Sequence, residues 1–167
     1  GRAGFDRILC DVPCSGDGTI RKSPEILSQW KPGHAMRLHP LQVLIAMRGL
    51  HLLAEGGLLV YSTCSLNPIE NEAVVAEVLR QSDGAVEVVD VGARLVGLKR
   101  RPGLRTWRVV DSDMTEVPTI ADIPPKEVRR SLLRRSMLPP AAHAAAAETG
   151  AATAKHVAAL ADAGARG

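Results

Sequence analysis

The chain has 167 residues, of which 46% are hydrophobic, and a formal net charge of +3. This length suits one globular domain or a part of a larger one, and mild basicity allows an acidic partner without requiring one. No apolar stretch approaches the ~20 residues of a membrane span, so we expect no membrane partner. The three cysteines, an odd number without a CxxC pair, argue against a disulfide framework and a zinc site. We therefore expect a reducing compartment and no bound metal.

The predicted elements begin with a short, mostly buried strand over residues 5–12, which a Gly-rich turn ends. A short helix is predicted over residues 23–30, with Ser23 as its N-cap. A longer helix should run from about residue 34 or 38 to residue 55. The Gly56-Gly57 pair should end it.

The next predicted strand covers residues 58–61. Asn67 as N-cap, with Glu70 three residues later, then predicts a capping box and a helix. Residues 85–91 read as another strand. Strands that alternate with helix-length connections predict an α/β fold with a parallel, doubly wound sheet.

The predicted structure becomes sparse after residue 91. Residues 92–140 form a basic, loop-rich extension, with a short basic helix expected over 126–135. Residues 141–167 are rich in alanine, which buries little area, so we expect disorder or a loose helix there. Only two Trp, one Tyr and one Phe occur, and Gly1 directly precedes a strand. We therefore expect a partial chain.

Two cysteines occur in similar settings, each just after a predicted strand. Cys14 lies in DVPCSGDGT (residues 11–19), and Cys64 lies in STCSLNPIENE (residues 62–72). Ligands bind at the carboxyl ends of strands in open parallel sheets, so both thiols should reach one crevice. A helix start after Cys64 favours its thiolate, and Asp11 could hydrogen-bond a polar ring or a cofactor. These residues suit nucleophilic chemistry, either addition to an electron-poor heterocycle or acyl transfer.

The residue pattern alone leaves alternatives open. A cysteine hydrolase would need a histidine partner, and no motif ties His34, His39 or His51 to either thiol. Two purely structural cysteines fit the same pattern, because unpaired cysteines are commonly buried. Cys10, on the first strand, is expected to be a buried small apolar residue.

The two cysteine segments resemble the signature motifs of the Sun family of RNA cytosine-5 methyltransferases. Residues 8–13 and 102–107 are similar to the eukaryotic tRNA-modifying branch of that family, and the resemblance is strong over residues 5–91. It implies part of a Rossmann-like S-adenosylmethionine-dependent methyltransferase fold, namely the carboxyl-side half of its sheet. Residues 1–91 would then be the catalytic half of the domain.

The resemblance also implies the roles of individual residues. Cys64 would be the nucleophile that attacks carbon 6 of cytosine, so that carbon 5 takes a methyl group from S-adenosyl-L-methionine. Cys14 would assist proton removal and product release, and Asp11 would lie beside the cofactor. Lys22, and with it Arg21, would contact RNA. The family's Gly-rich cofactor loop and its acidic ribose-binding residue lie on strands that would precede Gly1, so the isolated chain is expected to be incomplete for activity.

The implied partner is RNA, above all tRNA, and the implied location is the nucleus or nucleolus, with the cytoplasm as the alternative; the oligomeric state stays open. Two further readings remain. DNA cytosine-5 methyltransferases use a Pro-Cys cysteine as the nucleophile, and the Thr63-Cys64 motif argues against that reading. The other is a non-catalytic RNA-binding remnant, which the missing cofactor loop favours.

Overall fold

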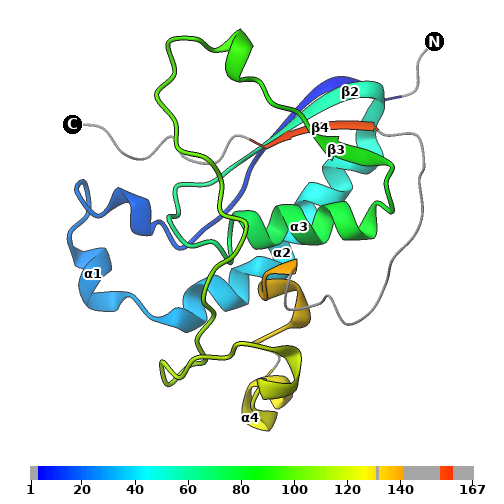
Figure 1. Ribbon diagram of the computed structural model, residues 1–167. Coiled ribbons are helices and arrows are strands. Elements are labelled where there is room, and N and C mark those ends of the chain that lie inside the picture. Colours follow the sequence, from blue (N-terminus) through cyan, green and yellow to red (C-terminus); the bar gives the residue numbers. More distant parts are fainter. Residues whose placement is uncertain (1–3, 131, 141–154, 160–167) are drawn as a thin grey trace.

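The computed structural model describes residues 4–130, 132–140 and 155–159 of the chain (Figure 1). Its sheet has the strand order β1-β2-β4-β3, and every pairing is parallel. The register pairs Asp11 with Ser62, so β1 and β2 end at the same level. The predicted parallel α/β sheet is confirmed. The strands are β1 (Phe5–Asp11), β2 (Leu53–Ser62), β3 (Val86–Val88) and β4 (Lys155–Ala159).

Two helices cover one face of this sheet. Leu59 and Tyr61 of β2 share one apolar core with buried side chains of both α2 and α3. The other face is more open, because Phe5 and Leu9 of β1 are 62% and 67% exposed. The prediction of a mostly buried first strand is therefore wrong, whereas the predicted burial of Cys10 is confirmed. The helices are α1 (Glu25–Gln29), α2 (Pro32–Leu52), α3 (Glu72–Gln81) and α4 (Pro125–Arg129).

The sequence predicted two helix boundaries wrongly, namely the start of α1 and the end of α2. Ser23 does not cap α1 with its side chain; its carbonyl accepts the Ile26 N–H, and the N-cap position falls on Pro24. The glycine pair does not end α2 either, because β2 already begins at Leu53. Leu53 is buried in the apolar core, so tertiary packing outweighs the glycine signal at this boundary.

The start of the next helix was also predicted too early. α3 begins at Glu72, and Asn71 takes the N-cap position. Asn67 instead accepts the Ile69 N–H at 3.0 Å and closes the turn that precedes the helix. The Asn67 motif therefore forms a turn, and the Glu70 side chain does not cap the helix.

Residues beyond 91 build a second apolar core although they contain little regular structure. The loop-like character of 92–125 is confirmed, with only short 3-10 turns such as Gly92–Arg94 (η2) and Ile120–Asp122 (η3). The predicted basic helix is shorter than expected, because the chain turns back after α4 to bury its leucines against α2. The second core consists of Ala35, Met36, Ile69, Val109, Val117, Leu132, Leu133, Met137 and Leu138.

The alanine-rich stretch contributes a strand rather than a loose helix where it is described. β4 pairs with β2 on one side and with β3 on the other. The prediction is wrong for residues 155–159, because unpaired backbone groups of two neighbouring strands offer partners that an isolated helix lacks. The remainder of that prediction lies outside the described residues.

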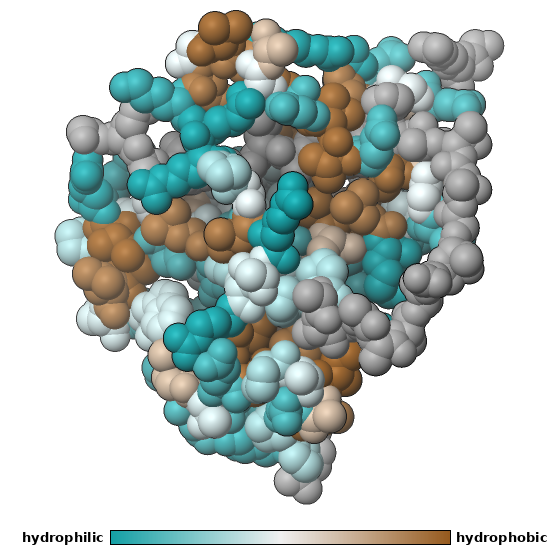
Figure 2. Space-filling model, viewed as in Figure 1, coloured by the Kyte–Doolittle hydropathy of each residue, from teal (hydrophilic) through white to brown (hydrophobic). Residues whose placement is uncertain are grey.

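Hydrophobic surface is visible over α1 and over the loop that contains η2 (Figure 2). Leu27 of α1 and Val96 after η2 are among the exposed apolar residues. Within the described ranges, no helix combines the length and the apolar character that a membrane crossing needs.

The second core gives a direct stability test. Met137 is fully buried, so Met137→Ala should lower the free energy of unfolding by about 2–5 kcal/mol. Val96 is 88% exposed, and Val96→Ala should change the free energy of unfolding by less than about 0.5 kcal/mol. Urea unfolding followed by circular dichroism measures both. Equal stability of the two variants would contradict packing of this segment.

Candidate functional site

Two loops leave the carboxyl ends of β1 and β2 side by side. The Val12 N–H donates to the Ser62 carbonyl at 3.1 Å, which extends the pairing beyond β1. Further on, the Gly18 N–H donates to the Cys64 carbonyl at 2.9 Å. A Cβ at position 18 would lie 2.7 Å from that oxygen, so glycine is what allows this approach. The backbones of the two loops are thus fastened to each other.

The two loop cysteines meet at this junction, as the sequence predicts. Cys14 Sγ lies 3.2 Å from Cys64 Sγ, and the Cys64 N–H donates to Cys14 Sγ at 3.3 Å. Cys64 is exposed and Cys14 is partly buried. Burial and the hydrogen bond with Cys64 raise the pKa of Cys14 to about 11. Cys14 therefore keeps its proton at neutral pH, and Cys64 is the thiol more open to an incoming molecule.

A buried carboxylate holds the residue that follows each cysteine. Glu70 is fully buried. Its Oε1 accepts the Ser15 N–H at 2.8 Å, and its Oε2 accepts the Ser65 hydroxyl at 2.6 Å as well as the Ser15 hydroxyl. The Gln42 amide also donates to Oε1, at 3.0 Å. Hydrogen bonds alone stabilise this charge, because no cationic side chain in the described ranges forms an ion pair with it.

The predicted capping-box role of Glu70 is wrong. Its side chain turns inward, and its carbonyl accepts the Tyr61 hydroxyl at 2.7 Å, which fixes the turn from β2 toward α3. The relevant signal in the sequence is the serine that follows each cysteine. A carboxylate that joins two serines 50 positions apart becomes visible only when the strand register is known.

A second network orders the loop around Cys64. The Thr63 hydroxyl donates to Asn71 Oδ1 at 2.7 Å, and the Asn71 amide donates to the Ser65 carbonyl at 2.9 Å. The Leu66 N–H donates to Asp17 Oδ1 at 2.7 Å, which ties the loop to the Cys14 segment once more. Cys64 therefore projects from a loop that is held at several points.

Asp11 lies at the end of β1, on the open face of the sheet. Its carboxylate is exposed and accepts the Ser62 hydroxyl at 2.8 Å, so it remains accessible to a polar group of a ligand. Lys22 and Arg21 lie in the exposed turn after η1 (Asp17–Thr19). No hydrogen bond or ion pair joins them to the cysteines within the described ranges.

Within the described ranges, no hydrogen bond joins a histidine to either cysteine of the site. His39 is buried, with Nδ1 2.7 Å from the Ile69 carbonyl and Nε2 2.8 Å from the Ser136 hydroxyl. Burial lowers its pKa, so the ring is neutral and structural. Among the residues that the structure describes, no group of three or more His, Cys, Asp or Glu could hold a metal ion.

A parallel α/β sheet with two adjoining cysteines at the ends of neighbouring strands defines a Rossmann-like domain with a two-thiol site. The family described as "16S rRNA methyltransferase RsmB/F" matches residues 1–121, and the chain belongs to that family. This family has the S-adenosylmethionine-dependent methyltransferase fold.

The chain is similar to eukaryotic and bacterial RNA methyltransferases. It is 56% identical over 118 residues to the "multisite-specific tRNA:(cytosine-C(5))-methyltransferase trm4b" of Schizosaccharomyces pombe, which covers 71% of this chain and 17% of the relative. It is 47% identical over 135 residues to the "tRNA (cytosine(34)-C(5))-methyltransferase" of Drosophila melanogaster, covering 81% and 18%. The "ribosomal RNA small subunit methyltransferase F" of Serratia proteamaculans is 40% identical over 96 residues, covering 58% and 20%. The chain thus spans about a fifth of these relatives' length.

Glu70→Gln tests the carboxylate bridge. The amide nitrogen of glutamine cannot accept a hydrogen bond, so at least one donor from Ser15 or Ser65 loses its partner. We expect a loss of about 1–3 kcal/mol in the free energy of unfolding. The exposed Glu25 is the matched control, and Glu25→Gln should change stability by less than about 0.5 kcal/mol. Wild-type stability of Glu70→Gln would contradict a bridging role.

Thiol alkylation tests the difference between the two cysteines. Iodoacetamide reacts with the thiolate, so at pH 7.5 it should modify the exposed Cys64 before Cys14, whose pKa is raised to about 11. Peptide mass spectrometry follows both sites over time. The rate at Cys14 should climb as the pH rises toward 11, and a Cys14 that reacts first at pH 7.5 would contradict the assignment.

Proposed function

We propose that this chain carries the catalytic cysteines of an enzyme that transfers a methyl group to carbon 5 of cytosine in RNA. The observation that carries the proposal is the thiol pair, with its two sulfur atoms 3.2 Å apart at the end of a parallel sheet. Carbon 5 of cytosine is a poor nucleophile. Addition of a thiolate to carbon 6 overcomes this, and a second group must then remove the proton from carbon 5.

Cys64 is the nucleophile in this proposal. It is the exposed thiol of the pair, and the loop networks fix its direction. Its sulfur forms a bond to carbon 6, which makes carbon 5 nucleophilic. After methylation and loss of the carbon 5 proton, the sulfur–carbon bond breaks and Cys64 is restored. The target base must leave any stack before the thiol can reach it, at a cost of a few kcal/mol.

Cys14 is the second cysteine, which assists proton removal and release. Its pKa is raised first by burial and then by its hydrogen bond with Cys64. When Cys64 is bonded to the base, its sulfur no longer carries a proton, so Cys14 can only donate to that sulfur. Cys14 lies 3.2 Å from the sulfur that would carry the base, where it can assist removal of the carbon 5 proton. Cys14 is partly buried and has a raised pKa, whereas Cys64 is exposed. This disfavours the DNA methyltransferase assignment, in which the cysteine of the Pro-Cys motif is the nucleophile.

The proposed methyl donor is S-adenosyl-L-methionine, because the family has the fold of methyltransferases that depend on it. Asp11 is the last residue of β1 and pairs with Ser62, two residues before Cys64. Its exposed carboxylate could contact a polar group of that cofactor. Asp11 is therefore proposed as a cofactor contact. The hydroxyl of Ser62, which donates to it, would fix the direction of the carboxylate.

The proposed substrate is tRNA, on the strength of the printed activities of the S. pombe and Drosophila relatives. Lys22 and Arg21 are proposed RNA contacts, because both are exposed in the turn that follows the Cys14 loop. For a tRNA-modifying protein of this kind we propose a nuclear or nucleolar location.

Cysteine variants of the full-length protein test the two roles separately. Cys64→Ala should abolish methylation and any covalent RNA adduct, because the attacking sulfur is gone. Cys14→Ala should accumulate a protein–RNA adduct, since release needs the second cysteine. Denaturing gel electrophoresis with labelled tRNA detects the adduct, and Cys10→Ala serves as the control for a buried cysteine. An adduct in Cys64→Ala and none in Cys14→Ala would reverse the assignment.

A further inference from the structure

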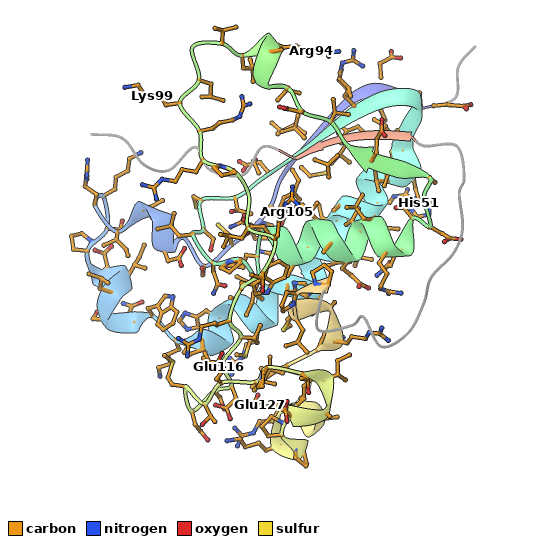
Figure 3. All side chains as sticks on the ribbon, viewed as in Figure 1. His51, Arg94, Lys99, Arg105, Glu116 and Glu127 are labelled. Carbon is orange, nitrogen blue, oxygen red and sulfur yellow. The ribbon has the colours of Figure 1, made fainter. Side chains whose placement is uncertain are left out.

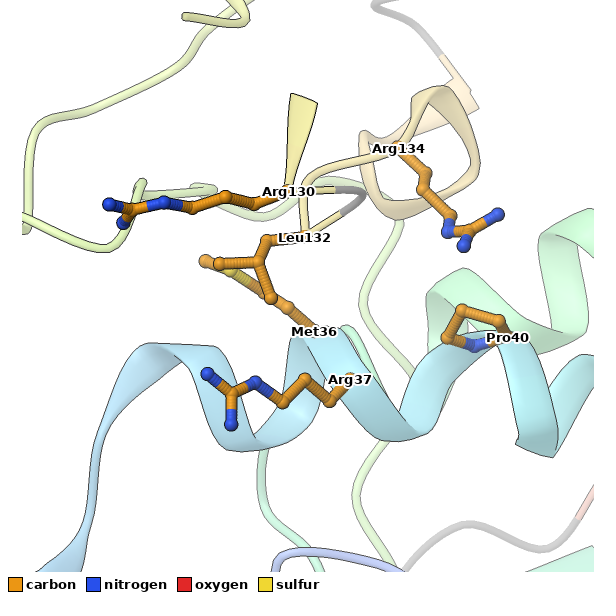
Figure 4. A pocket seen from close by; sticks show the side chains of 6 residues that line it. All are labelled: Met36, Arg37, Pro40, Arg130, Leu132 and Arg134. Carbon is orange, nitrogen blue, oxygen red and sulfur yellow. The ribbon is translucent and has the colours of Figure 1, made fainter. Parts of the chain in front are cut away.

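A pocket lies between the first turns of α2 and the segment that follows α4, and neither cysteine of the site lines it (Figure 4). Its volume is about 520 Å³, which is in the range of ligand sites. Met36 and Leu132 are buried members of the second core and form its apolar floor. The lining consists of Met36, Arg37, Pro40, Arg130, Leu132 and Arg134.

The charge of this pocket is entirely positive. Arg37, Arg130 and Arg134 are exposed, and no acidic side chain lines the pocket. Within the described ranges none of the three forms an ion pair, whereas Arg80 and Arg108 bind Glu77 and Glu116. Three guanidinium groups without carboxylate partners form a site for anions, and guanidinium binds phosphate through paired hydrogen bonds.

The arginines are spread along the pocket rather than aimed at one point. Arg37 and Arg130 extend to the same side of the Met36–Leu132 contact, and Arg134 lies on the other side, over Pro40 (Figure 4). Guanidinium groups that converge on one point would bind a single phosphate ion best. Separate groups along an open pocket suit the successive phosphates of a nucleic-acid strand.

The pocket is joined to the cysteine site through the second core. α2 connects two parallel strands, so its first turns lie at the carboxyl edge of the sheet, where the thiols are. Ile69 packs in the same core as Met36 and Leu132, and the next residue is Glu70. A strand bound in the pocket would therefore contact the core that also holds the residue before Glu70.

We propose that Arg37, Arg130 and Arg134 bind consecutive backbone phosphates of the RNA substrate and position its strand beside the cysteine site. The proposal rests on the proposed function, of which it names a substrate-binding surface. These contacts read no sequence, because phosphates are the same at every nucleotide. They set how the strand lies, and the cysteine site acts on the base that reaches it.

The test is the salt dependence of tRNA binding by the full-length protein, measured by fluorescence anisotropy between about 50 and 200 mM salt. Each of Arg37→Gln, Arg130→Gln and Arg134→Gln should reduce the slope of log affinity against log salt by about 0.7–0.9. The triple variant should reduce it by about 2–3. Phosphate-ethylation interference should show adjacent phosphates that matter for the wild type and not for the triple variant.

The matched control removes the same charge elsewhere. Arg94 and Lys99 lie on the η2 loop at the opposite end of the molecule from Glu127 of α4 (Figure 3), and Arg101 follows them in the chain. The combined Arg94→Gln, Lys99→Gln and Arg101→Gln variant should keep the ethylation pattern of the wild type. If it changes both slope and pattern as much as the pocket variant does, net charge explains the binding and the proposal is overturned.

Three further outcomes separate the two sources of phosphate, and the pocket proposal from the proposed function. Inorganic phosphate at constant ionic strength should not displace tRNA; displacement that the triple variant abolishes would assign the pocket to a free phosphate ion and overturn the proposal. If the triple variant methylates and binds tRNA as the wild type does, the pocket proposal is overturned and the proposed function stands. A wild type that binds tRNA through the pocket without methylating cytosine would overturn the proposed function and leave the pocket standing.

Discussion

The side chain of Glu70 is the contact on which the arrangement of both cysteines depends. It forms no ion pair among the described residues, and its hydrogen-bond donors are Ser15, Ser65 and Gln42. Each serine follows its cysteine directly, and separation of the loops would remove both Ser15 donors from the buried carboxylate. The cost of that state keeps the loops together, and the 3.2 Å approach of the two thiols is a consequence.

The same constraint explains why the less regular half of the chain matters to the site. Ile69 is buried in the second core together with Met137 and Leu138, and its carbonyl contacts the buried ring of His39. This fixes the backbone immediately before Glu70. The loop-like segment beyond residue 91 therefore supports the cysteine site from behind, in addition to supplying two of the three pocket arginines.

The sequence predicted the parallel sheet and the meeting of Cys14 with Cys64, because both follow from strands that end at one edge. It did not predict the role of Glu70, since the same residues also read as a capping box. The second core escaped prediction because its apolar residues are separated by prolines and charges and show no period. The strand at residues 155–159 escaped because its alanines favour helix, and only unpaired neighbours make it a strand.

The two thiols of the site differ in exposure, and only Cys14 is partly buried. Cys14 is partly buried behind Cys64 and accepts its N–H, whereas Cys64 is exposed at the end of a braced loop. Burial favours the neutral form of Cys14, and the hydrogen bond between the thiols adds to that preference. The contact between the two sulfurs therefore links the protonation of Cys14 to the state of Cys64, while Cys64 itself stays accessible.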